Sequence, residues 1–411
     1  MRVEVINTGT ELLLGNVLNT HLKFFAEALF PLGLRIERQV TVPDGDAIRD
    51  ALAETFGRAE IVLVTGGLGP TTDDVTRELV AGLLSIELIH DEEIMQAIAA
   101  RFGRRGLKMG ERVRLQALRP REAVVLPNHH GTAPGLYLPP QPGREMPHLF
   151  LLPGPPRELK PMFHDAVLPI VEGLLPPGPR AEMRTYRVAS LGESAVEELV
   201  GERLLELGLE VGYCARPGEV DLRLIGSREV LATAHSIVQA QLGLHIVTEG
   251  SQTLEQVVVE LLTERRETLA TAESCTGGGL AHRLTNVPGA SAVFIEGFVT
   301  YANEAKTRSL GVDGSLLREH GAVSGPVARA MADGARRVAG ADHALATTGV
   351  AGPGGGTEEK PVGTVFIALA TRLGETTVTR HRFASDRETF KNLTTQTALD
   401  LLRRRLAATT R

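Results

Sequence analysis

Short apolar segments alternate with amphipathic ones along the first part of the chain. Residues 3–8 and 35–42 have the composition of strands, whereas apolar positions recur at helical spacing in residues 19–32 and 47–56. A continuous apolar run follows at 59–65, as expected of a strand buried on both faces of a parallel sheet. This alternation predicts an α/β fold that begins with a doubly wound, three-layer domain.

A glycine-rich turn follows that buried strand. Gly66, Gly67 and Gly69 stand before Asp73 and Asp74. The glycines allow the main chain to approach a ligand closely, and we expect a helix capped by Thr and Asp side chains to follow. The two aspartates can be explained as ordinary first-turn residues that complement a helix dipole.

Two other loops are expected at the same edge of this sheet. Thr8–Glu11 follows the first strand, and Pro153–Glu158 follows a predicted strand at His148–Leu152. The carboxyl ends of parallel strands share one edge, so Glu11 should lie near the two aspartates. Carboxylates beside glycine N–H groups fit a hydrated, Mg²⁺-type cation that bridges to phosphates.

The segment Thr271–Gly279 carries the strongest chemical signal of the chain. An apolar strand ends there, and Ser274 stands before Thr276, Gly277 and Gly278 at a glycine-rich helix start. Unpaired N–H groups at such a start favour a phosphate or a developing oxyanion. We therefore expect Ser274 to act as a nucleophile, with the N–H groups of Thr276, Gly277 and Gly278 around the oxyanion.

A base for this serine is found in residues 297–306, where a predicted strand runs into a polar helix start. Lys306 is the candidate, because a lysine in a partly dry pocket has a lowered pKa and can accept the serine proton. Tyr301 could relay or donate a proton. Cys275 is the rival nucleophile, but no cationic neighbour is evident that would ionise its thiol, and the serine is favoured.

A second glycine-rich loop follows a predicted strand at residues 343–347. Such a loop can wrap around a phosphate or a ribose. Its candidate substrate-binding residues are Thr348, Gly349, Gly352, Gly354 and Gly355.

The proline-rich segment Leu174–Pro179 separates a first domain, residues 1–173, from the remainder. Residues 180–248 are predicted to form strand, helix, two strands and helix. This small α/β unit resembles a KH domain but has no GXXG loop, through which KH domains bind RNA. We interpret it as a spacer or dimerisation element. The third domain is predicted at residues 251–411.

The composition and charge of the chain indicate its general class. A chain of 411 residues with 43% hydrophobic residues and a net charge of −6 fits a soluble, multidomain protein, and this charge disfavours a nucleic-acid partner. Arg403, Arg404 and Arg405 are interpreted as a solvated helix end. Cys214 and Cys275 support neither a disulfide framework nor a cysteine metal site. Neither a secretory signal nor a membrane span is evident, so we expect a cytoplasmic protein.

The motifs AESCTGG, YANEAK, GAVS and TGVAGPGGG…EKPVGTV resemble the C-terminal domain of the CinA-type (competence/damage-inducible) family. This resemblance implies a nicotinamide mononucleotide amidohydrolase that forms nicotinic acid mononucleotide and ammonia without a cofactor. It assigns the nucleophile to Ser274, the base to Lys306 and the assisting hydroxyl to Tyr301. The loop at residues 349–356 and Arg387 would then anchor the phosphate and ribose.

The motifs TGGLGPTTDDVT and LPGPPRE resemble the molybdopterin-binding MoaB/MogA-like domain, and specifically the N-terminal domain of CinA-type proteins. The resemblance implies a metal-dependent ADP-ribose pyrophosphatase that forms AMP and ribose 5-phosphate. Its divalent ion (Mg, Mn or Co) would lie at Asp73, Asp74 and Glu11. Molybdenum-cofactor enzymes of this fold usually have TGGTG and an Arg-Asp pair. Here Leu68 and Thr72-Asp73 replace these, which argues against pterin binding.

The sequence thus predicts a bifunctional pyridine-nucleotide recycling enzyme that acts on two small nucleotides and forms a homodimer. The main alternative is a non-catalytic nucleotide- or pterin-binding scaffold linked to competence or the DNA damage response. In a third possibility, only the C-terminal domain is active.

Overall fold

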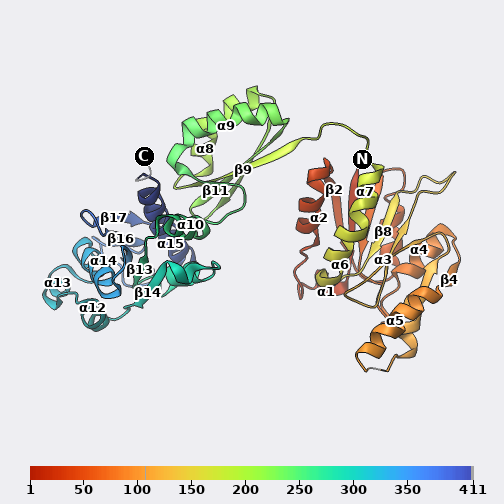
Figure 1. Cartoon of the computed structure of the whole chain (residues 1–411), viewed down its shortest axis with the longest axis horizontal. Helices are drawn as coiled ribbons and strands as arrows, with labels where there is room; N and C mark the ends of the chain where they lie inside the picture. The colour runs from red at the N-terminus through yellow and green to blue at the C-terminus, as the bar shows by residue number, and fades with distance from the viewer. Residues whose placement is uncertain (107, 409–411) are drawn as a thin grey trace. The chain divides into compact units, whose positions relative to one another are not determined.

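The computed structural model describes residues 1–106 and 108–408 and divides into two compact units, Met1–Ala181 and Glu182–Arg411 (Figure 1). Each unit combines helices with sheets, so the predicted multidomain α/β class is confirmed. The last three residues of the third predicted domain, 409–411, lie outside the described residues. Among the described residues, no helix is both long and apolar enough to cross a membrane.

A six-stranded sheet in the order β2-β1-β3-β8-β7-β6 organises the first unit. Its strands are β1 (Val3–Thr8), β2 (Ile36–Val42), β3 (Ile61–Thr65), β6 (Val124–Leu126), β7 (Gly135–Leu138) and β8 (His148–Leu152). β1, β2, β3 and β8 are parallel, whereas β7 is antiparallel to β6 and β8. The loops that follow β1, β3 and β8 therefore meet at one edge, as predicted.

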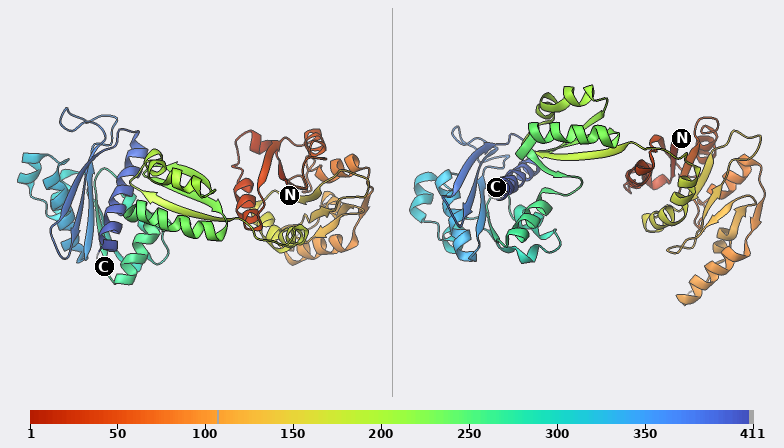
Figure 2. Two further views of the ribbon diagram at one scale, coloured as in Figure 1. Left: turned by 90° about the horizontal axis from the view of Figure 1, so that it is seen from above. Right: turned by 45° about the horizontal axis from the view of Figure 1, so that its top comes forward.

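Helices cover both faces of this sheet (Figure 2). They are α1 (Thr10–Leu13), α2 (His21–Leu29), α3 (Asp46–Ala53), α4 (Thr76–Leu84), α5 (Glu92–Arg104), α6 (Pro156–Met162) and α7 (Leu168–Leu174); a small separate sheet pairs β4 (Leu88–His90) with β5 (Leu118–Pro120). Alternate residues of β3 enter opposite cores: Ile61 and Leu63 lie in the core of α2 and α7, whereas Val62 and Val64 lie in that of α3 and α4. Burial on both faces explains why this strand is apolar at every position.

The helix after the glycine turn begins later than predicted. α4 starts at Thr76, its N-cap is Val75, and no side chain caps it. Asp73 and Asp74 lie in the turn before the helix instead. One oxygen of the Asp74 carboxylate accepts the N–H of Thr71 at 2.9 Å, so the turn closes on itself before the chain enters the helix.

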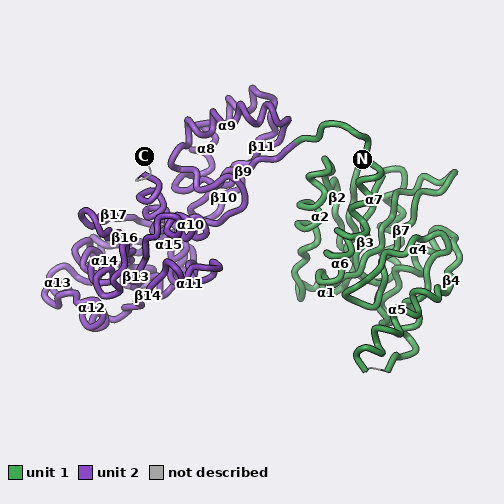
Figure 3. Tube along the Cα trace, in the orientation of Figure 1, with its two compact units in different colours: residues 1–181 green, residues 182–411 purple. Residues whose placement is uncertain are grey.

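The second unit, purple in Figure 3, contains two sheets. An antiparallel sheet, β10-β11-β9-β12, comprises β9 (Glu182–Ala189), β10 (Glu210–Arg216), β11 (Glu219–Gly226) and β12 (Ile246–Glu249), with α8 (Glu193–Glu206) and α9 (Arg228–Leu242). The larger sheet, β14-β13-β15-β16-β17, comprises β13 (Leu269–Glu273), β14 (Phe294–Val299), β15 (His343–Gly349), β16 (Thr364–Thr371) and β17 (Thr377–Arg382). Its helices are α10 (Leu254–Arg265), α11 (Gly279–Thr285), α12 (Asn303–Leu310), α13 (Gly314–His320), α14 (Gly325–Ala339) and α15 (Arg387–Ala408).

Polar side chains join the small sheet to α15. The hydroxyl of Ser190 donates to Asp400 at 2.8 Å, and Arg403 donates both to Asp400 at 2.8 Å and to the carbonyl of Ile246 at 3.0 Å. Arg403 is only 4% exposed, so the expectation of a solvated helix end is wrong for this residue. Its guanidinium is buried because it donates hydrogen bonds to backbone carbonyls of the small domain.

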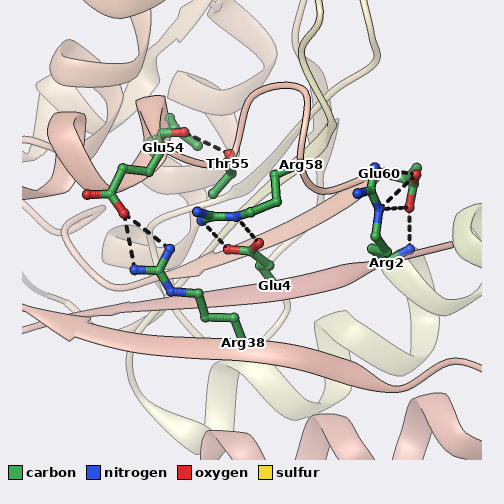
Figure 4. Close-up of polar contacts among 8 residues, drawn as sticks. Arg2, Glu4, Arg38, Glu54, Thr55, Arg58 and Glu60 are labelled. Carbon is green, nitrogen blue, oxygen red and sulfur yellow. Dashed lines mark hydrogen bonds and ion pairs between the residues drawn. The ribbon is translucent and has the colours of Figure 1, made fainter.

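An ion pair between a buried carboxylate and a half-exposed arginine also braces the first unit (Figure 4). The Glu4 side chain on β1 is 7% exposed, and Arg58, just before β3, donates two hydrogen bonds to it at 2.5 and 2.8 Å. The Arg38–Glu54 pair, at 3.1 Å, has side chains that are 42% and 57% exposed and contributes less. The Glu4–Arg58 pair thus fixes the amino ends of two strands whose carboxyl ends carry the predicted ligand-binding loops.

Candidate active site

Ser274 and Lys306 are in direct contact although they come from different elements. Ser274 follows β13, and Lys306 lies on α12, which follows β14; the two strands pair in parallel up to Glu273 and Val299. The Nζ of Lys306 donates a hydrogen bond to Oγ of Ser274 at 3.1 Å. The nucleophile and base that the sequence predicted therefore lie within proton-transfer distance.

Lys306 is held in a nearly dry position. Its side chain is 1% exposed, and its Nζ also donates to the carbonyls of Thr300 at 2.8 Å and Tyr301 at 3.3 Å. Burial lowers the pKa of this amine, and the nearby Glu304 only partly opposes that effect. The neutral amine that a general base requires is thus easier to reach than in a solvated lysine.

Cys275 lies in the opposite electrostatic situation. Its side chain is 5% exposed, and burial raises the pKa of its thiol to about 12. A thiol with such a pKa stays protonated near neutral pH and is a poor nucleophile. This favours Ser274 over its neighbour.

The loop that carries Ser274 is organised by Glu273, a residue that the sequence analysis did not single out. This fully buried carboxylate accepts the hydroxyl of Thr276 at 2.7 Å and the N–H groups of Gly278, Leu280 and Ala281 at 3.1, 3.0 and 2.9 Å. A glutamate at the end of a strand, shortly before a helix start, was the available signal, because carboxylates are favourable near helix N-termini.

The N–H groups around the serine differ from the expected arrangement. That of Gly277 donates to the carbonyl of Ser274 at 3.2 Å, and that of Gly278 donates to Glu273, so neither is free for an oxyanion. Within the described part of the chain, the N–H groups of Cys275 and Thr276 have no hydrogen-bond acceptor. An oxyanion site would therefore use the N–H group of Thr276, as expected, with that of Cys275 in place of those of the two glycines.

Arg387 connects Tyr301, the predicted assisting hydroxyl, with the second glycine-rich loop. It donates to the hydroxyl of Tyr301 at 3.0 Å and to the carbonyl of Gly352 at 2.7 Å. The Tyr301 side chain is 61% exposed, so its hydroxyl lies at the surface while its carbonyl contacts Lys306. The structure thus brings Ser274, Lys306, Tyr301, Arg387 and the second glycine-rich loop into one region.

The residues of that loop differ in their freedom to bind a ligand. The hydroxyl of Thr348 is buried and donates to the carbonyl of Ala322 at 2.7 Å, and Gly349 pairs with Val365 in the sheet. Gly354 has open space around it, and Gly355 has a positive φ of 85°. Gly354 and Gly355 are therefore free to approach a ligand, whereas Thr348 and Gly349 form part of the end of β15.

In the first unit, the candidate metal- and phosphate-binding residues line one pocket of about 480 Å³ at the carboxyl ends of β1, β3 and β8. The pocket contains Glu11, Gly66, Gly67, Gly69, Asp73 and Asp74. Asp44 and Gln116 line it as well and were missed. Asp44 follows the parallel strand β2, so its place along the chain was a usable signal, whereas nothing local marks Gln116.

The donor set of this pocket suits a hard cation that keeps water ligands. The acidic side chains of the pocket supply carboxylate oxygens, which are suitable ligands for Mg²⁺, Mn²⁺ and Co²⁺. Among the described residues, however, no three acidic, histidine or cysteine side chains are grouped closely enough to hold a metal ion by themselves. Water and phosphate oxygens would have to complete the coordination.

Comparison with known proteins identifies three matching families along the chain. They are the CinA C-terminal domain over residues 251–406, a probable molybdopterin binding domain over residues 4–173, and the damage-inducible protein CinA KH domain over residues 183–242. The small middle domain is thus KH-like, as predicted.

Several relatives match nearly the whole chain. A CinA-like protein of Akkermansia muciniphila is 47% identical over 400 residues, which cover 97% of this chain and 96% of the relative. A putative competence-damage inducible protein of Caldicellulosiruptor bescii is 41% identical over 415 residues, 99% of both chains. A solved CinA superfamily structure from Klebsiella pneumoniae is 39% identical and covers 38% of this chain and 96% of its own, with a TM-score of 0.37.

The contrast between the two cysteines gives a direct test of the site. Iodoacetamide at pH 8 should modify the exposed Cys214 in the native protein, and Cys275 roughly 100-fold more slowly or not at all, because its thiol is buried and un-ionised. Mass spectrometry of tryptic peptides measures both rates. Comparable labelling of the two cysteines in the folded protein would show that Cys275 is ionised and accessible after all.

Proposed function

Since this chain belongs to the CinA family, we propose that its C-terminal domain hydrolyses the carboxamide of nicotinamide mononucleotide to nicotinic acid mononucleotide and ammonia. The observation that carries this proposal is the 3.1 Å contact between Nζ of Lys306 and Oγ of Ser274 in a nearly dry position. A hydroxyl beside a buried amine is a nucleophile with its own base.

In the proposed reaction, neutral Lys306 takes the proton of Ser274 while Oγ attacks the carboxamide carbon. The negative charge that develops on the carboxamide oxygen is stabilised by the N–H groups of Cys275 and Thr276. The ammonium of Lys306 then returns a proton to the departing nitrogen, and ammonia leaves. Water attacks the resulting ester with Lys306 again as base, which releases the acid and restores Ser274.

For the first unit we propose metal-dependent hydrolysis of ADP-ribose to AMP and ribose 5-phosphate. The pocket that combines the glycine turn with Glu11, Asp73 and Asp74 supports this proposal. One or two of these carboxylates, together with water and phosphate oxygens, would hold a divalent cation (Mg²⁺, Mn²⁺ or Co²⁺), which when bound neutralises diphosphate charge and lowers the pKa of a bound water. The positive φ angles of Gly66 and Gly67, 102° and 67°, require glycine in this turn, and a Cβ at either position would collide with Thr8 or Thr76.

Replacement of the proposed nucleophile separates the enzymatic proposal from a scaffold role. Ser274→Ala should lower ammonia release from nicotinamide mononucleotide by at least about 10³-fold, because among the described residues Lys306 donates to no other hydroxyl. The matched variant Cys275→Ala should keep most of the activity. Enzymatic ammonia determination measures both. Activity retained in the first variant and lost in the second would overturn the assignment, and an inactive unmodified protein would favour the scaffold.

The acidic pocket is tested by a double substitution in the same chain. Asp73→Ala with Asp74→Ala should abolish metal-stimulated AMP formation from ADP-ribose, because the cation loses its ligands. Ammonia release should be unchanged, because that site lies in the other unit. Chromatography of the nucleotide products is the readout. ADP-ribose hydrolysis that survives the double substitution would place the site elsewhere.

A further inference from the structure

A buried hydrogen-bond network connects the small KH-like domain with the helix that follows the nucleophile. We call it the interdomain network; it consists of Glu219 at the start of β11, Gln396 on α15 and Arg283 on α11. The Nε2 of Gln396 donates to Glu219 at 2.5 Å, and the Oε1 of Gln396 accepts a hydrogen bond from Arg283 at 2.7 Å. One glutamine thus joins a carboxylate of the small domain to a guanidinium of the C-terminal domain.

The burial of Gln396 fixes the direction of these contacts. Gln396 is 5% exposed, and its amide has one donor end, which faces the carboxylate, and one acceptor end, which faces the guanidinium. The hairpin that carries Glu219 lies directly on this side chain, because a Cβ on Gly218 would be only 2.8 Å from Cγ of Gln396. Loss of Glu219 would therefore leave a buried donor without its acceptor, which is unfavourable.

Both ends of the interdomain network are held by further charges. The side chain of Glu219 is 12% exposed and lies 3.8 Å from Arg187 on the neighbouring strand β9. At the other end, Arg283 donates to Glu255 on α10 at 2.7 Å. The network is therefore anchored in the sheet of the small domain on one side and between two helices of the C-terminal domain on the other.

The position of Arg283 is coupled to the nucleophile through α11. This helix has seven residues, and at its amino end Glu273 accepts the N–H groups of Leu280 and Ala281 at 3.0 and 2.9 Å. The same carboxylate accepts the hydroxyl of Thr276 at 2.7 Å, and the N–H of Thr276 is one of the two proposed oxyanion donors. Because so short a helix moves as one piece, a displacement at Arg283 also displaces that donor.

We infer that Glu219 of the KH-like domain is a positioning residue for the C-terminal site and acts through Gln396 and Arg283 on the oxyanion donors. The inference rests on the proposed deamidation. Oxyanion donors lower the barrier only when they are held where negative charge develops in the transition state. The interdomain network should therefore affect kcat rather than substrate affinity, and the small domain contributes to catalysis instead of serving only as a spacer.

Substitutions at the two ends of the domain contact test this role, with each variant assayed well below its melting temperature. Glu219→Ala should lower kcat for ammonia release about fivefold or more and leave KM within about twofold, because the displaced donors act only in the transition state. Glu219→Gln should restore most of kcat, because its side-chain oxygen can still accept from Gln396. The matched control is Ser190→Ala, which removes the 2.8 Å hydrogen bond to Asp400 that joins the same two domains outside the network, and it should leave kcat unchanged.

Failure of the positioning role is distinguishable from failure of the proposed reaction. If the unmodified protein releases ammonia, an unchanged kcat in Glu219→Ala, or an equal loss in Ser190→Ala, overturns the inference alone. If the unmodified protein releases no ammonia, the proposed function fails, and hydrogen–deuterium exchange decides. The N–H groups of Leu280 and Ala281 should then exchange about tenfold faster in Glu219→Ala than in the unmodified protein or in Ser190→Ala. Equal exchange in the two variants would show that Glu219 does not hold α11.

Discussion

The hydrogen bond between Lys306 and Ser274 is the interaction on which the second unit's candidate site depends. A buried ammonium has three donors to satisfy, and Lys306 finds three acceptors: the serine hydroxyl and the carbonyls of Thr300 and Tyr301. These contacts offset part of the desolvation cost, while burial still lowers the pKa of the amine. The parallel pairing of β13 and β14 makes the contact possible, because it brings two distant loops to one edge.

The two units use a similar backbone arrangement for different chemistry. Each places a glycine-rich turn at the end of a buried strand, next to a neighbouring parallel strand. The first unit surrounds its turn with carboxylates, which suits a phosphate substrate only through a bridging cation. The second unit has the cations Lys391 and Arg387, with one carboxylate, Glu388, in a cavity near its turn. The side chains at the sheet edge, rather than the fold, therefore separate the two proposed activities.

Local patterns predicted most of the elements and both sets of loops. β1 and β8 have the expected bounds. Because the carboxyl ends of parallel strands meet at one edge, Glu11 was expected near the two aspartates, and all three line one pocket. Features that depend on contacts between distant segments were not predictable. Lys391 lies more than 110 residues from Ser274, and Arg403 is buried only because the small domain lies against α15. The late start of α4 follows from hydrogen bonds inside a turn, which propensity rules do not describe.

The pH dependence of kcat/KM for ammonia release tests the central claim most directly, because it reports the pKa of the base in the free enzyme. The rate should rise as Lys306 loses its proton and should reach a plateau below the ordinary lysine pKa of about 10.4, since burial lowers the pKa of this amine. A rate that still rises through the ordinary lysine range, or one that falls as the pH increases from neutral, would contradict a buried, neutral Lys306 as the base for Ser274.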